Sequence, residues 1–116
     1  MSVGQYLDRE GRVIDKAHWE ELQDNREYVR IGATEMRAGR NPETLIRVST
    51  VWTGVNTGSH EIFETLVMRD NNQIDSARYQ QESAARQGHN EMVGKHLFAS
   101  DLRGPKLVRE IPEDEA

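Results

Sequence analysis

The chain contains no cysteine, which excludes disulfide bonds, thiolate nucleophiles and thiolate metal sites. It also has no apolar run near the ~18 residues that a membrane-spanning helix requires. Its opening residues lack the basic start and apolar stretch of a secretion signal. These absences predict a cytoplasmic protein that does not bind a membrane.

Hydrophobic residues are also scarce, at 35% of the 116 residues, and the mean hydropathy is -0.82. A chain of this length suits one domain and is too short for a Rossmann-sized enzyme. We expect a single α+β domain over residues 1–100 and an extended, partly mobile arm over 101–116. Acidic residues outnumber basic ones by 20 to 15, so we expect no direct binding of nucleic acid.

Hydrophobic periodicity predicts an α+β fold whose sheet is a four-stranded antiparallel meander over 27–79. At Gln80 the period changes from two to three or four, which indicates a helix packed across one face of the sheet. Asp15 is placed to cap a short helix, and Gly88 could let the longer helix approach the sheet closely. The expected elements are a hairpin at 5–14, a helix at 16–24, strands at 27–35, 44–55, 61–68 and 73–79, and a helix at 80–97.

The segments 44–55 and 61–68 carry apolar residues on both faces. A single helix can cover only one of those faces. We therefore expect a homodimer.

The four histidines do not have the spacing of a metal site. His89 and His96 would lie about 10 Å apart along a helix, too far to bind one ion. We expect structural or exposed roles for the histidines, with no metal and no cofactor.

The loop at 54–60 holds both a serine and a histidine, but they are adjacent in sequence and no Gly-x-Ser-x-Gly elbow is present. The same loop lacks the Gly-Lys-Ser/Thr of a phosphate-binding loop. We therefore predict that the protein is not an enzyme.

Charged residues within the expected strands are the best binding candidates, because a guanidinium can pair with a carboxylate or a phosphate. The same residues could instead form a cross-strand ladder of ion pairs. The acidic residues near 113–115 are either a solubilising segment or a DNA-mimicking or docking segment. The candidate binding residues are Arg30, Arg47, Glu64 and Arg78 in strands and Asn56, Thr57, Ser59 and His60 in the loop.

Two stretches, Val48 to Gly54 and Ile62 to Met68, resemble a family of small uncharacterised proteins from tailed bacteriophages, prophages and actinobacteria. The resemblance extends over about residues 5–97 and includes Arg78-Tyr79 and Gly88-His89. At Val55-Asn56-Thr57 the chain differs from the family, which usually has Leu-Asp-His there. The resemblance implies a phage or prophage accessory protein that acts in the host cytoplasm.

Three functions are consistent with these observations. The first is a non-enzymatic, inhibitor-like modulator that binds a host or anti-phage defence protein. The second is a small-ligand or nucleotide-binding module that uses the strand arginines and the 54–60 loop. The third is a virion or assembly component.

Overall fold

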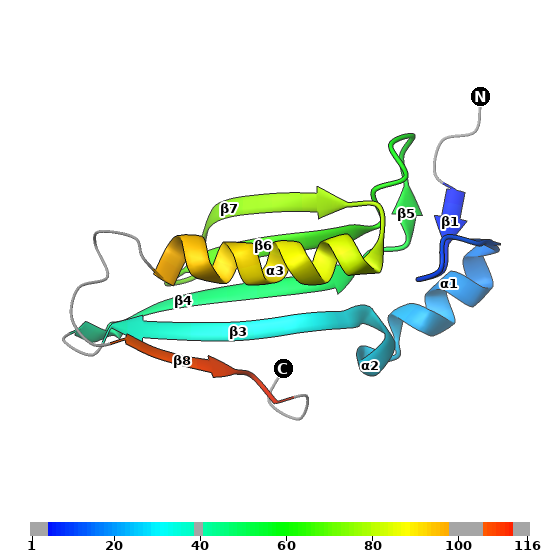
Figure 1. The fold of residues 1–116 in the computed structure, drawn as a ribbon. Coiled ribbons are helices and arrows are strands. Elements are labelled where there is room, and N and C mark those ends of the chain that lie inside the picture. Colours follow the sequence, from blue (N-terminus) through cyan, green and yellow to red (C-terminus); the bar gives the residue numbers. More distant parts are fainter. Residues whose placement is uncertain (1–4, 39–40, 98–105, 113–116) are drawn as a thin grey trace.

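The computed structural model describes residues 5–38, 41–97 and 106–112. A five-stranded antiparallel sheet forms the body of the protein, and helix α3 (Glu82–Leu97) crosses one of its faces (Figure 1). The strands lie in the order β7-β6-β4-β3-β8. Their bounds are β3 Arg30–Ala38, β4 Asn41–Trp52, β6 Phe63–Arg69, β7 Asn72–Tyr79 and β8 Lys106–Glu110.

A second, small sheet with the order β2-β1-β5 lies at one end of the large one (Figure 1). Two short helices follow β2 along the chain. The Asp15 carboxylate caps the first by accepting the His18 backbone N–H, and the Asn25 side chain caps the second by accepting that of Tyr28. The bounds are β1 Gln5–Leu7, β2 Val13–Ile14, β5 Val55–Asn56, α1 Lys16–Gln23 and α2 Arg26–Val29.

The core lies between α3 and the sheet. Most inward side chains of β3, β4 and β6 are buried there. Gly88 lets the helix come close, because a Cβ at this position would lie 2.2 Å from the Tyr79 ring. The expected close approach at Gly88 is therefore confirmed. The main core residues are Met36, Ile46, Val48, Trp52, Phe63 and Val67, with Ala85, Met92 and Val93 from α3.

A chain of buried hydrogen bonds crosses this core. His89 on α3 bonds through Nε2 to the Thr34 hydroxyl at 2.9 Å and through Nδ1 to the Thr50 hydroxyl at 2.7 Å. The Thr50 hydroxyl also forms a hydrogen bond with the Thr65 hydroxyl at 2.6 Å. The Thr34 hydroxyl donates to the Glu110 carboxylate at 2.9 Å. Burial lowers the pKa of His89, with Glu110 opposing this shift. A neutral imidazole satisfied at both nitrogens is thus part of the core.

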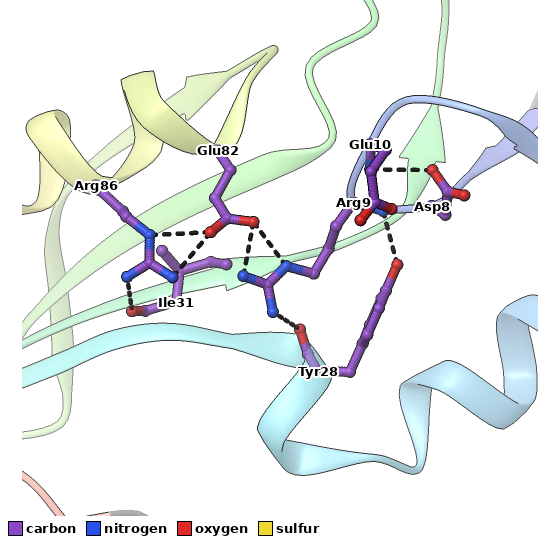
Figure 2. Close-up of polar contacts among 7 residues, drawn as sticks. All are labelled: Asp8, Arg9, Glu10, Tyr28, Ile31, Glu82 and Arg86. Carbon is purple, nitrogen blue, oxygen red and sulfur yellow. Dashed lines mark hydrogen bonds and ion pairs between the residues drawn. The ribbon is translucent and has the colours of Figure 1, made fainter.

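Arg9, in the turn between β1 and β2, joins the small sheet to α3 (Figure 2). Its Nε and Nη2 lie 2.8 and 2.6 Å from Oε1 of Glu82, and its Nη1 donates to the Tyr28 carbonyl at 3.1 Å. Glu82 also accepts from Arg86 at 2.9 Å, and Arg86 reaches the Ile31 carbonyl at 3.5 Å. This network fixes the N-terminal elements against the end of the large sheet.

At the other end of α3, Asp75 of β7 accepts hydrogen bonds from Lys95 at 2.7 Å and from His96 at 3.0 Å. These two bonds, the one from Lys95 most strongly, lower the pKa of Asp75 to about 2. The helix is therefore held to the sheet by charged contacts at both ends.

The α+β class is confirmed, but the sheet has five strands rather than the four of the predicted meander. The fifth, β8, falls in the segment expected to be an extended arm. It pairs with the outer edge of β3, and Ile111 after it is 3% exposed. The remaining parts of the expected arm, 101–105 and 113–116, lie outside the described residues.

Several strand bounds differ from the prediction, and two of these differences have a clear local cause. Residues 26–29 form a helical turn, because the Asn25 cap starts a helix where a strand was expected to begin. Strand β4 ends at Trp52 rather than at residue 55, because Gly54 has a φ of 71° and its position admits no Cβ beside Trp52 and Trp19.

Candidate functional site

The sheet has a second face, opposite α3, which we call the helix-free face. Because side chains alternate along a strand, the neighbours of the core residues point to this side. Helix α2 lies at one end of it, beside Val51, and within the described residues no helix covers the rest. Its side chains are those of Ala33, Glu35, Arg37, Leu45, Arg47, Ser49, Val51, Glu64, Leu66, Met68, Ser76, Arg78 and Arg109.

Apolar side chains occupy the middle of the helix-free face. Leu45, Val51, Leu66 and Met68 are all half-buried, so part of each is in contact with water. A hollow of about 280 Å³ is lined by Leu45 and Met68 and by the polar residues Arg47, Asp70 and Asn71. The centre of the helix-free face is therefore hollowed and exposes part of its apolar side chains to water.

Charged side chains cross the same face as ion pairs between neighbouring strands. Glu35 accepts a hydrogen bond from Arg109 of β8, and its Oε2 lies 3.9 Å from Nη2 of Arg47 of β4. The bond from Arg109 is the main reason why the pKa of Glu35 is lowered. Glu64 of β6 pairs with Arg78 of β7 at 3.1 Å. The cross-strand ladder considered for Arg47, Glu64 and Arg78 is confirmed.

The helix-free face has an excess of positive charge although the chain as a whole carries -5. Glu35 and Glu64 are the acidic residues at its described strand positions, and Asp70 borders the hollow beside Leu45 and Arg47. Its basic residues are Arg37, Arg47, Arg78 and Arg109. A surface of this sign on an acidic protein favours an acidic partner.

Arg30 was grouped with the other strand arginines, but the structure places it apart from them. Its Nη2 lies 3.8 Å from Glu110 and donates to the Ile111 carbonyl, at the edge where β3 meets the end of β8. It also lines a pocket of about 330 Å³ at the α2 end of the helix-free face.

Of the four predicted binding residues in the 54–60 loop, Thr57 lies beside predicted strand residues. Thr57 borders a hollow of about 170 Å³ together with Glu64 and Arg78. Asn56 is buried, and its Oδ1 accepts the backbone N–H groups of Gly58 and His60, both at 2.9 Å.

The other two loop residues stay at the surface. Ser59 and His60 are exposed, and the Ser59 carbonyl accepts a 2.7 Å bond from Gln80. Asn56 therefore shapes the loop, while Arg47 lies at the opposite end of the face, beside Asn71. The predicted residues do not converge on one site.

No group of three or more histidine, aspartate or glutamate side chains able to hold a metal occurs in the described part of the chain. In the same ranges, no helix is long and apolar enough to cross a membrane. Comparison with protein-family models, with curated proteins and with solved structures found no significant match to this chain.

Proposed function

We propose that the protein is a non-enzymatic binding protein that docks a partner protein on the helix-free face. One observation carries this proposal. Half-buried apolar side chains lie between strand-fixed ion pairs on a sheet face that no described helix covers beyond its α2 end. An apolar centre with a charged surround is the usual arrangement of a protein interface.

Charge favours an acidic partner over a second copy of this chain. Two copies placed face to face would bring their excess of arginines together, which costs free energy unless each ion pair rearranges. The homodimer remains a prediction that sedimentation can test. A monomer mass at tens of micromolar would count against it.

The composition of the face also favours protein over nucleic acid. No aromatic side chain is among its residues, so it offers no stacking platform for bases. Glu35 and Glu64 would repel phosphates. Leu66 and Met68 would gain little from contact with a sugar–phosphate backbone.

The kind of partner follows from the resemblance to phage and prophage proteins, and we include it in the proposal as a host or anti-phage defence factor. The small-ligand alternative is less well supported at the 54–60 loop. The hollow there, of about 170 Å³, is below the usual size of ligand pockets, and Arg78 is already paired with Glu64. A virion role is separated by testing whether purified particles contain the protein.

The proposal is tested in two stages. Native mass spectrometry of the protein from infected cells identifies a bound partner. Calorimetry then compares that purified partner with wild type, Leu66→Glu on the helix-free face and Ala84→Glu on the exposed side of α3. We expect Leu66→Glu to weaken binding at least about 30-fold, as for a central interface residue, and Ala84→Glu to change it less than about twofold. Equal affinities for all three proteins would refute the proposal.

A further inference from the structure

A pocket of about 330 Å³ lies at the α2 end of the helix-free face. We call it the α2 pocket. Val29 of α2, Ala33 of β3 and Val51 of β4 form its apolar wall, and the ends of the two short helices border it through Gln23 and Arg26. Its size suits one or two amino-acid side chains and is at the lower limit for a larger organic ligand.

The charges around the α2 pocket all have one sign. Arg26 and Arg30 line it and no acidic residue does, in a chain with 20 acidic and 15 basic residues. The polar groups Gln23 and Ser49 add neutral hydrogen-bonding capacity. A carboxylate entering this pocket would meet no like charge on its wall.

Arg30 has hydrogen-bonding capacity to spare. Its Nη2 donates to the Ile111 carbonyl and lies 3.8 Å from Oε1 of Glu110, but its Nη1 is buried and has no hydrogen-bond partner in the described structure. Leaving a buried guanidinium nitrogen unpaired is unfavourable, and an acceptor placed beside it removes that cost. A carboxylate suits the planar fork of the guanidinium better than a neutral acceptor does.

We propose that the α2 pocket anchors the partner by binding a glutamate side chain together with a neighbouring apolar side chain. The carboxylate would pair with Arg26 and Arg30 once the Arg30 guanidinium turns its buried Nη1 toward the pocket, and the apolar group would cover Val29 and Val51. This inference rests on the proposed function, because it assigns the partner's anchor to one end of the helix-free face. Its charge agrees with the positive excess of that face.

The test uses two matched dipeptides, so it does not depend on knowing the partner. Acetyl-Leu-Glu-amide and acetyl-Leu-Gln-amide are titrated into the ¹⁵N-labelled full chain and followed by amide chemical shifts. The glutamate peptide should bind with a Kd of about 1–10 mM, as expected for a ligand of this size, and should shift the amides of Ala33, Ser49 and Val51. The glutamine peptide should bind at least about tenfold more weakly, because it lacks the charge.

Three variants control the site. Arg30→Met removes the proposed anion partner, and Ser49→Leu fills the pocket without changing any charge. Each should weaken the glutamate peptide at least tenfold. Lys95→Met removes an exposed cation from α3, on the opposite face of the sheet, and should leave the Kd unchanged. Since Arg30 also holds Ile111, the Ser49→Leu result decides the question if Arg30→Met fails to fold.

Several results would overturn the inference. They are equal binding of the two peptides, shifts that map elsewhere, or unchanged binding in Ser49→Leu. Binding of free 4-methylpentanoate without binding of the dipeptide would instead make the pocket a site for a small carboxylate. None of these results bears on the Leu66→Glu comparison, so failure of the anchor and failure of the docking face can be told apart.

Discussion

Replacing Arg9 by alanine should destabilise the fold more than removing any arginine of the helix-free face. Arg9 makes two charge-assisted contacts to Glu82 and one hydrogen bond to the Tyr28 carbonyl, and its guanidinium lies 5.4 Å from the centre of the Tyr28 ring. The Arg9 and Glu82 side chains are only 18% and 31% exposed. Water therefore screens this pair less than a surface pair.

The expected cost of Arg9→Ala is about 2–3 kcal/mol of unfolding free energy. Breaking a well-buried ion pair costs about 3–5 kcal/mol, and this pair is discounted because it is partly exposed and because Arg86 still bonds Glu82 afterwards. For a domain of this size the loss corresponds to a decrease in Tm of about 10 °C. In the wild type, burial raises the pKa of Glu82, but the hydrogen bonds from Arg9 and Arg86 together lower it by more. Loss of the Arg9 bonds should therefore raise the pKa of Glu82.

Urea unfolding of Arg9→Ala beside Arg78→Ala provides the measurement. Both variants remove an arginine paired with a glutamate, but Arg78 is 58% exposed, so its loss should cost under about 1 kcal/mol. In a double-mutant cycle, Arg9→Ala and Glu82→Gln should couple by at least about 1 kcal/mol. Equal costs for the two arginine variants, or no coupling, would refute the role given to this network.

Four further predictions concern the core and the packing of α3. Gly88→Ala should destabilise by about 2 kcal/mol, because its Cβ would overlap the end of the Tyr79 ring. Gly94→Ala, with no neighbouring atom within 4 Å of the added Cβ, should stabilise by up to about 1 kcal/mol, and thermal melts compare the two variants. Thr50→Val should cost about 1–3 kcal/mol in urea unfolding, because it leaves Nδ1 of His89 unpaired. Because the pKa of His89 is lowered in the folded protein, this histidine takes up a proton at higher pH in the unfolded chain than in the fold. The stability of the protein should therefore fall as pH drops below about 6.5, and this pH dependence should disappear in His89→Gln. Asp75, with a pKa of about 2, stabilises the fold above about pH 4 by about 1 kcal/mol after discounting for exposure. This contribution should be lost as pH falls toward 2. Asp75→Asn should lack that part of the acid transition.

Local patterns were sufficient for much of the fold. The Asp15 cap, the change of period at Gln80 and the alternation along 44–52 are set by neighbours in sequence, and the structure agrees with them. Strand β8 could not be predicted in this way. Its five residues pair only with β3, about 70 positions earlier in the chain, and a short segment carries no signal for so distant a partner.

The buried His89 network was also missed. A single histidine on a helix has the same local pattern whether it is exposed or buried. A signal was present in the strands, where Thr34, Thr50 and Thr65 take inward positions that their neighbours fill with apolar residues. Three such threonines facing one helix indicate a buried polar group between them.

The stretches on which the predicted resemblance to phage proteins rests meet beneath α3. Thr50, Trp52, Phe63 and Thr65 come from two of them, and His89 from a third. These residues are buried, so they specify the fold rather than a binding surface. Identifying the candidate surface required knowing which face of the sheet α3 leaves uncovered, and only the tertiary structure shows this.

The central claim is that a partner binds the helix-free face, and methyl cross-saturation tests it most directly. The protein is deuterated with ¹³C-labelled methyl groups and mixed with the unlabelled partner identified by native mass spectrometry. Irradiation of the partner should reduce the methyl signals of Leu45, Val51, Leu66 and Met68, which lie on that face. Loss of signal confined to Val13, which is 68% exposed on the small sheet, with those four methyl-bearing residues unaffected, would contradict it.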